Sequence, residues 1–281
     1  MKNCLVLQTD FGLVDGAVAA MKGVALQMDE NLEVFDLTHD ITPYNIWEAS
    51  YRLFQSVEYW PKGTVFVSVV DPGVGSSRKS LVAETAQGHY IVTPDNGTLT
   101  HLAAFVGISN VREIDETRNR LKNSENSYTF HGRDVYAYTG AKLASGKMKF
   151  SETGPSYPAE TIVKLQLGSV SLSQGTVEGC IDILDVRYGS LWTNIPRADF
   201  LEATNAKVGD TIDVKISHEG RICYSGSVKY GFSFAEVSIG EPVIYVNSLY
   251  RVGLAVNQGS FSSIYNIGTG IDWRIQFSCK K

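Results

Sequence analysis

The residues best suited to chemistry follow the segment 65–70, an apolar and β-branched run that predicts a buried strand. This run ends at Asp71 in the glycine-containing loop D-P-G-V-G-S-S-R. Arg78 closes the loop, where it can pair with Asp71 and fix the position of the carboxylate. An aspartate and an arginine held in this way, together with a histidine such as His131, can orient and polarise a water molecule. The loop is therefore the first candidate site.

Three other motifs place acidic or histidine side chains at similar positions. Asp10 follows the first apolar run, T-H-D at 38–40 follows the second, and F-H-G-R-D occupies 130–134. Ligands of open α/β sheets bind beyond the carboxyl ends of the strands, so we expect these motifs to converge on one edge of a sheet. Aspartates at such positions also cap helices and form turns. That explanation suffices for one motif but is weaker for four, because capping needs neither histidine nor arginine.

The first part of the chain alternates apolar runs with helical periodicity, which predicts an α/β domain with a mostly parallel sheet over residues 1–168. Strands are expected at 4–8, 32–37, 65–70, 80–85 and 89–93, and helices at 15–28, 45–59 and from 130 to about 145. The polar segment 119–127 is expected to be a loop. Each of the four motifs then lies where a strand ends or a helix begins.

From about residue 175, short runs of alternating apolar and polar residues are separated by glycine-rich turns. This pattern predicts an all-β, barrel-like second domain over residues 169–281. Its loops at 185–195, 233–237 and 246–260 are rich in small polar residues. Such loops bind ligands in many β domains, although they also serve simply as turns. Phe234 and Trp192 can stack on a flat ring, but packing is the ordinary role of an aromatic residue beside a strand.

Composition excludes several classes of function. The 281 residues carry a net charge of -5 with a pI of about 5.6 and no basic stripe, which argues against a nucleic-acid partner. The four cysteines form no CxxC pair, which is typical of reduced thiols in a cytoplasmic protein. We expect no membrane association, because the sequence has neither a signal-peptide pattern nor an apolar run of the roughly 20 residues that a span needs.

Common cofactor motifs do not match. The loop after Asp71 lacks the Gly-Lys-Ser/Thr ending of a phosphate-binding P-loop, and the first strand lacks the G-x-G-x-x-G pattern of dinucleotide binding. A metal-dependent hydrolase remains a general alternative, although no H-x-H or H-E-x-x-H spacing supports it. Its candidate ligands are Asp10, His39, Asp40, Asp71 and His131.

Seven motifs in order carry a resemblance that extends over nearly the whole chain. They are T-D-F-G-x-x-D, H-x-I-T-P-Y, K-G-T-V-F-V-S-V-V-D-P-G-V-G-S-S-R, V-T-P-D-N-G, T-F-H-G-R-D, Y-G-S-L-W-T-N-I and N-S-x-x-x-x-G-L-A-V-N-Q-G-S. Together they resemble the S-adenosylmethionine (SAM) hydroxide adenosyltransferase family, the hydrolytic relatives of the bacterial fluorinase and chlorinase. The resemblance implies an α/β domain, a barrel-like domain and a homotrimer with active sites at subunit interfaces. It also implies hydrolysis of SAM to adenosine and methionine without a metal or other cofactor.

Carried over residue by residue, the resemblance implies that Asp71, Arg78 and His131 form the water-activating set. In the first domain it implies substrate contacts from Asp10 at the ribose hydroxyls, Asp15, Tyr44 at the ribose and methionine side, and Thr129, Phe130 and Gly132 at the reacting centre. In the second domain it implies contacts from Asp185 at the amino group, Ser190, Phe234 stacked on adenine, Ser248 at the carboxylate, Val256 and Gln258.

The chain departs from its halogenating relatives at informative positions. Those relatives lack the Asp and His of the water-activating set, with a tyrosine typical at the first position, whereas this chain has Asp71 and His131. That difference favours hydroxide over a halide. Ser190 stands where family members often have asparagine, and Leu249 stands where the halogenases have arginine. Halide-dependent adenosyl transfer of the chlorinase type, and adenosine or SAM binding without catalysis, remain as alternatives.

Overall fold

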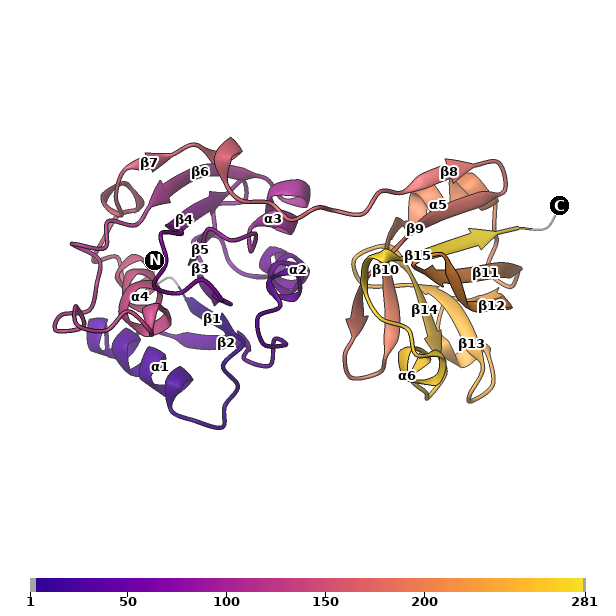
Figure 1. The fold of residues 1–281 in the computed structure, drawn as a ribbon, viewed down its shortest axis with the longest axis horizontal. Helices are drawn as coiled ribbons and strands as arrows, with labels where there is room; N and C mark the ends of the chain where they lie inside the picture. Colours follow the sequence, from indigo (N-terminus) through magenta and orange to yellow (C-terminus); the bar gives the residue numbers. More distant parts are fainter. Residues whose placement is uncertain (1–3, 280–281) are drawn as a thin grey trace. The chain divides into compact units, whose positions relative to one another are not determined.

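The computed structural model describes residues 4–279 and divides into two compact units. The first unit ends at Leu165 and the second begins at Gln166 (Figure 1). The first is an α/β unit and the second is an all-β unit, as the sequence patterns predict.

The first unit alternates strands and helices along the chain. Its elements are β1 (Leu5–Thr9), α1 (Ala17–Met28), β2 (Val34–Thr38), α2 (Ile46–Ser56), the 3-10 turn η1 (Val57–Tyr59), β3 (Val65–Val69), β4 (Ser80–Thr85), β5 (Tyr90–Pro94), α3 (Thr100–Phe105), β6 (Ile108–Glu113), the π-helix η2 (Gly132–Ala137), α4 (Tyr138–Ala144), the 3-10 turn η3 (Phe150–Glu152), β7 (Ser156–Tyr157) and the 3-10 turn η4 (Ala159–Thr161). The predicted helix at 45–59 is thus α2 continued by a 3-10 turn.

The strands form one mixed sheet in the order β2-β1-β3-β5-β4-β6-β7. The first four strands in this order are parallel, and β4, β6 and β7 extend the sheet by antiparallel pairing. The parallel part places β2 and β3 on opposite sides of β1, so the order reverses beside β1. The crevice beyond the carboxyl ends of β1 and β3 is where folds of this kind bind ligands. Asp10 and Asp71 follow these two ends.

Both faces of β1, β3 and β5 are buried, which explains their nearly continuous apolar sequences, whereas the edge strand β2 is partly exposed. Along β1, Leu5 and Leu7 belong to one core cluster and Val6 to another, because successive side chains point to opposite faces. Helices α1 and α4 cover the first face, whereas α2 and α3 cover the second (Figure 1). The helices thus fix the strands whose ends carry the candidate residues.

The second unit is a closed seven-stranded barrel. Its elements are β8 (Ser171–Ser173), β9 (Thr176–Asp185), β10 (Ser190–Pro196), α5 (Arg197–Thr204), β11 (Thr211–His218), β12 (Arg221–Tyr230), the 3-10 turn η5 (Phe234–Glu236), β13 (Pro242–Val246), β14 (Arg251–Val256), α6 (Phe261–Tyr265) and β15 (Gly270–Ser278). Neighbouring strands follow the order β10-β14-β13-β12-β11-β15-β9, pairing between β9 and β10 closes the barrel, and β8 adds to β9.

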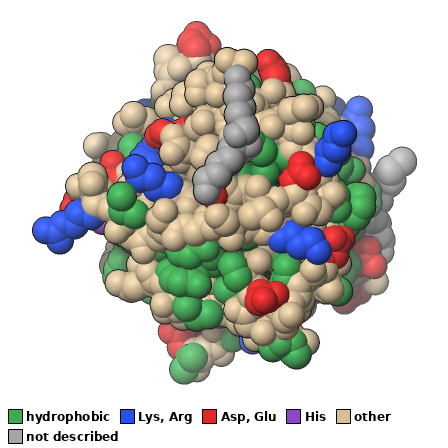
Figure 2. All heavy atoms as spheres, turned by 90° about the vertical axis from the view of Figure 1, so that its right-hand side faces the viewer, with side chains coloured by type: hydrophobic (Ala, Val, Ile, Leu, Met, Phe, Trp, Pro, Cys, Tyr) green, Lys and Arg blue, Asp and Glu red, His purple; other side chains and the backbone are tan. Residues whose placement is uncertain are grey.

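The barrel interior is filled by alternate side chains of its strands. Phe200 of α5 and Phe277 of β15 are fully buried there, with ring centroids 5.6 Å apart in an edge-to-face arrangement. Figure 2 shows one face of this unit, on which acidic and basic side chains are interspersed among apolar ones. The interior of the barrel is therefore a packed core.

Candidate active site

Asp71 and Arg78 form a two-point ion pair in the loop between β3 and β4. Arg78 Nε donates to Asp71 Oδ1 at 2.9 Å, and Arg78 Nη2 donates to Asp71 Oδ2. Both side chains are largely buried, with 4% of the aspartate and 11% of the arginine exposed. Burial is the largest single influence and lowers the pKa of Arg78, but the hydrogen bonds to Asp71 and the nearby Tyr136, Asp71 and Glu116 together raise it, so the guanidinium stays charged. The pair is rigid and directional.

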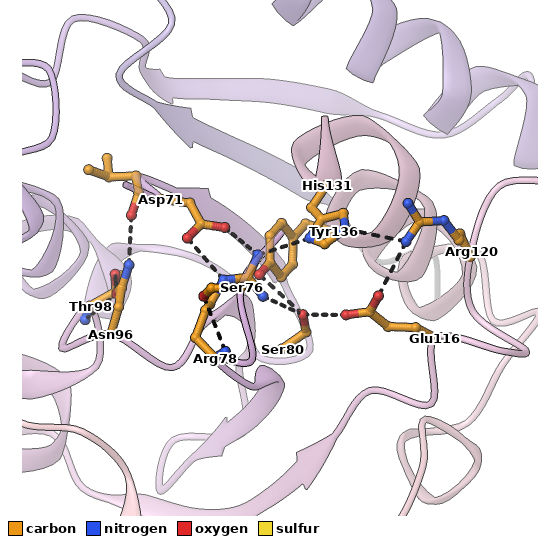
Figure 3. A network of polar contacts seen from close by, with 11 residues as sticks. Asp71, Ser76, Arg78, Ser80, Asn96, Thr98, Glu116, Arg120, His131 and Tyr136 are labelled. Atoms are coloured by element: carbon orange, nitrogen blue, oxygen red, sulfur yellow. Dashed lines mark hydrogen bonds and ion pairs between the residues drawn. The ribbon is translucent and has the colours of Figure 1, made fainter. Parts of the chain in front are cut away.

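His131 completes the predicted set. It immediately precedes the π-helix η2, and its Nδ1 lies 3.0 Å from Arg78 Nη2 (Figure 3). Burial, followed by the nearby guanidinium groups of Arg78 and Arg120, lowers the pKa of His131 and favours the neutral imidazole. The structure thus brings His131 together with Asp71 and Arg78 from two separate places in the sequence. A π-helical turn at this point is a common feature of functional sites.

Four further residues in this cluster escaped the sequence analysis. Ser80, Glu116, Arg120 and Tyr136 are all joined to it by hydrogen bonds or ring contacts (Figure 3). Glu116 and Arg120 occupy the polar segment after β6, part of which was expected to be an ordinary loop. Their spacing of four residues, which suits an ion pair, was the only available signal.

Asp10 and Tyr44 meet at the end of β1. The Tyr44 backbone N–H donates to Asp10 Oδ2 at 2.8 Å, and Tyr44 itself adopts a φ of 68°. A tyrosine in this left-handed region is uncommon, and such strain tends to occur at functional sites. The Tyr44 side chain is 73% exposed. The Asp10 carboxylate is thus oriented by backbone, and an exposed ring lies beside it.

The other predicted residues of the first unit lie near these groups or at helix ends. Asp15 is exposed and accepts a hydrogen bond from the Ala17 N–H at the start of α1, which is a capping contact. Phe130 packs edge-to-face on Phe11, with ring centroids 5.9 Å apart. A Cβ on Gly132 would lie 3.1 Å from the Phe11 ring, so glycine allows close packing there. Thr129 lies 3.2 Å from Ser127 Oγ.

His39 has a structural role. Its Nδ1 lies 2.8 Å from Thr9 Oγ1, and its Nε2 lies 3.0 Å from Asp36 Oδ1. Its carbonyl accepts from the Gly12 N–H at 2.8 Å, so it ties the loop carrying Asp10 to the end of β2. Among residues 4–279, no group of three or more His, Cys, Asp or Glu side chains is placed to hold a metal ion. The general metal-hydrolase alternative therefore has no ligand cluster in that range.

Asn96, in the turn after β5, supports the central loop. Its Nδ2 donates to the Val70 carbonyl at 2.8 Å, and its Oδ1 accepts from Thr98 Oγ1 at 2.8 Å (Figure 3). The adjacent Asp95 accepts from Tyr157 and from the Val163 backbone N–H. The P-D-N-G motif thus holds the backbone from which Asp71 projects.

The barrel unit has a separate pocket of about 610 Å³. Five of its predicted binding residues line this pocket, namely Asp185, Ser190, Phe234, Val256 and Gln258. Arg187 and Tyr188, which the sequence analysis did not select, line it as well. Gln258 adopts a φ of 56°, a second strained residue at a candidate site. The pocket combines an acid, a basic side chain and aromatic rings, which suits a polar ligand with a flat ring.

Ser248 differs from the other predicted residues of the barrel unit. It lies exposed in the turn between β13 and β14 and does not line the 610 Å³ pocket. Phe234, in contrast, is 43% exposed, and its ring lies 4.8 Å from that of Tyr245. One face of the Phe234 ring is thus supported while part of the side chain stays accessible.

Within residues 4–279, no helix combines the length and apolar character that a membrane crossing requires.

Both units match the models of a known protein family. The model of the SAM hydroxide adenosyltransferase N-terminal domain matches residues 5–154, and that of the C-terminal domain matches residues 179–274. The chain therefore belongs to the SAM hydroxide adenosyltransferase family, as its seven motifs suggested.

Individual relatives agree with this assignment. The chain is 37% identical to the (R)-S-adenosyl-L-methionine hydrolase of Methanocaldococcus jannaschii, over 78% of this chain and 76% of the relative. It is 28% identical to the fluorinase of an Actinoplanes species, over 95% of both. The crystal structure of an uncharacterized conserved protein from Thermotoga maritima matches with a TM-score of 0.89 and 30% identity, over 98% of this chain and 100% of the other.

Proposed function

We propose that this protein is an enzyme that hydrolyses S-adenosyl-L-methionine to adenosine and L-methionine. The observation that carries the proposal is the buried Asp71–Arg78–His131 cluster. The relative from Methanocaldococcus jannaschii, at 37% identity, is named for this reaction. The substrate and the product adenosine are small molecules, and the reaction needs no metal or other cofactor, because the positively charged sulfur of the substrate is itself a good leaving group.

The reaction balances without a further reactant. The oxygen of water attacks the 5′-carbon of the ribose, and the C5′–S bond breaks with its electron pair going to sulfur, which becomes the neutral thioether of methionine. The attacking water loses one proton, which passes to solvent. Since the leaving group is good, the enzyme mainly has to hold the water in line at about 3–3.5 Å from the carbon.

Asp71 and Arg78 orient this water. His131 shares the proton that the water loses. The two-point bond to Arg78 fixes the Asp71 carboxylate, so this group acts by orienting the water. His131 is largely buried, and its lowered pKa favours the neutral imidazole at neutral pH. Asp10 binds the ribose hydroxyls, and Phe130, Thr129 and Gly132 line the reacting centre.

The remaining contacts come from the barrel pocket. Asp185 binds the amino group of the substrate, Phe234 stacks on adenine, and Ser190, Val256 and Gln258 complete the pocket. Ser248, which lies outside this pocket in the turn between β13 and β14, holds the carboxylate in the proposal. In the proposed homotrimer, this pocket meets the Asp71 cluster of a neighbouring subunit. The predicted catalytic residues lie in the first unit and the pocket residues lie in the second, and this division supports the proposed arrangement.

Exposed apolar side chains also support an interface. Leu13 and Val14 are exposed between Asp10 and Asp15, and Tyr188 is exposed on the rim of the barrel pocket. Exposed apolar groups beside a site commonly become buried in an assembly. A cytoplasmic location is part of the proposal, because all four cysteines are free thiols.

The test is to incubate the purified protein with SAM and to separate the products by chromatography. We expect adenosine and methionine in equal amounts, in buffer with or without chloride. Absence of adenosine throughout the neutral pH range would overturn the proposal. Adenosine that stays bound is detected by mass spectrometry of the protein as purified, and binding without turnover would identify a nucleoside-binding protein instead.

Halide-dependent transfer is a second candidate, favoured by the 28% identity to a fluorinase. The same chromatogram decides between the two, because this alternative yields a 5′-halogenated deoxyadenosine at high halide concentration. We expect adenosine to remain the product, because Asp71 and His131 are present.

A further inference from the structure

Five side chains form a closed ring of polar contacts at the candidate active site (Figure 3). Arg78 Nη1 donates to Ser80 Oγ at 2.9 Å, and Ser80 Oγ donates to Glu116 Oε1 at 2.8 Å. Arg120 Nη1 donates to the other oxygen, Glu116 Oε2, at 3.2 Å. The His131 imidazole closes the ring, with Nδ1 at 3.0 Å from Arg78 and Nε2 at 3.3 Å from Arg120.

The imidazole alone cannot hold both arginines. A guanidinium only donates hydrogen bonds, whereas a neutral imidazole has one accepting nitrogen. At most one of the two contacts to His131 is therefore a hydrogen bond. Asp71 also holds Arg78, and the Ser127 carbonyl accepts from Arg120 Nη2 at 2.9 Å. Glu116 accepts from Arg120 directly and from Arg78 through Ser80. Glu116 thus connects Arg78, through Ser80, with Arg120.

We propose that Glu116 is a positioning residue for the hydrolytic reaction, which holds Arg78 and Arg120 on the two sides of the His131 imidazole. The inference rests on the proposed function and extends it to a residue that the family resemblance did not select. Glu116 acts through its neighbours and contacts neither the substrate nor the attacking water.

The charges around His131 give this role a measurable signature. Asp71 and Arg78 face the imidazole from the loop after β3, Glu116 and Arg120 face it from the segment after β6, and the Tyr128 ring lies 6.0 Å away. Burial lowers the pKa of His131 most. Glu116 is the strongest group that raises it, ahead of the lowering by the arginines and the raising by Asp71. Neutralising Glu116 should therefore lower the pKa of His131 further.

The experiment compares Glu116→Gln with the wild-type enzyme. We expect the single-turnover rate of adenosine formation to fall on the order of tenfold, because the arginines and the imidazole lose alignment. The SAM concentration giving half-maximal rate should change less than about twofold, since Glu116 does not bind substrate. The acidic limb of the pH–rate profile, where His131 gains a proton, should shift to lower pH. A merely structural role would not produce that shift.

Matched variants separate this role from general damage. Glu113→Gln removes a nearby carboxylate that pairs with Lys79 outside the ring, so its rate and pH profile should match wild type. Ser80→Ala removes the link between Glu116 and Arg78, together with the 3.2 Å contact of Ser80 Oγ with Tyr136, but keeps the bond from Arg120 to Glu116, and it should lower the rate less than Glu116→Gln does. Glu116→Asp keeps the charge and should restore part of the rate. Because the Glu116 side chain is 33% exposed, the two changes at Glu116 should leave the fold intact, and circular dichroism checks this for every variant.

A second measurement does not depend on activity. NMR titration of the histidine rings without substrate, with His131→Gln used for assignment, should show a lower His131 midpoint in Glu116→Gln. An unchanged rate and an unchanged His131 midpoint in Glu116→Gln would overturn the inference. If the wild-type protein forms no adenosine, the proposed function fails, and the titration alone decides whether Glu116 controls His131.

Discussion

Asp71 depends on its charge for both of its contacts with Arg78. Asp71→Asn keeps the shape of the side chain but replaces one accepting oxygen with an NH₂ group, which faces an arginine that can only donate. We expect the rate of adenosine formation to fall on the order of 100-fold or more. Asp29→Asn, the same change at the end of α1, should leave the rate unaltered. Equal rates for Asp71→Asn and wild type would remove Asp71 from the mechanism.

Asp182 in the barrel should make the stability of the protein depend on pH. Burial raises its pKa to about 6, although Arg251 Nη1 at 3.8 Å favours the ionised form. Because the folded chain holds this proton more tightly than the unfolded chain, the contribution of Asp182 to stability is largest at low pH. It is lost as the pH rises from about 4 to about 6, and it amounts to roughly 2–3 kcal/mol.

Asp182→Asn should remove this contribution to the pH dependence. Denaturant unfolding of the variant and of wild type between pH 4 and pH 7 measures it as a difference in slope. Relative to the variant, the wild type should lose stability as the pH rises through this window. Parallel stability curves would show that Asp182 has the same pKa in the folded and unfolded chains.

Helix α4 lies unusually close to the sheet at Gly140. A Cβ on Gly140 would lie 2.4 Å from Val67 Cγ2 and 3.2 Å from Leu5 Cδ1. Gly140→Ala should therefore destabilise the α/β unit by about 1–3 kcal/mol, despite the higher helix propensity of alanine. Gly23→Ala in α1 meets nothing within 4 Å and should stabilise by up to about 1 kcal/mol. Thermal unfolding of both variants tests the pair, and a stabilised Gly140→Ala would contradict the close contact.

The sequence was most informative about elements whose burial determines their composition. The strands near 65–70 and 80–93 could be predicted because buried strands need apolar, β-branched residues. The segment 130–145 reads as one helix, but it begins with the π-helix η2 before α4. Periodicity could not show this, because π-helical and α-helical turns carry similar residues. The antiparallel extension by β6 and β7 depends on pairing between distant segments.

The site was partly predictable for a related reason. Asp71, Arg78 and His131 stand in motifs with glycines and strand ends, so their types and positions marked them. Glu116 and Arg120 lie in a polar segment without such marks, and their importance comes from contacts with residues 80 and 131. Only the fold brings those positions together.

At the scale of the whole molecule, the proposed trimer can be tested by mixing two inactive proteins. Asp71→Ala damages the first unit and Asp185→Ala damages the second. If each site combines the first unit of one subunit with the second unit of its neighbour, mixed trimers contain some sites with both residues intact. In an equal mixture, half of the copies of each unit are intact. Random assembly therefore gives both intact units to about a quarter of the sites and restores about a quarter of the wild-type activity.

A site built within one chain behaves differently, because every chain in the mixture then lacks one of the two residues and no activity returns. The two variants should be unfolded, combined and refolded together so that subunits exchange, and adenosine formation should be compared with that of each variant refolded alone. Analytical ultracentrifugation of the same samples gives the mass of the assembly. Recovery of activity in a species of three chains supports the interfacial site, whereas a fully active single chain in the wild-type control would contradict it.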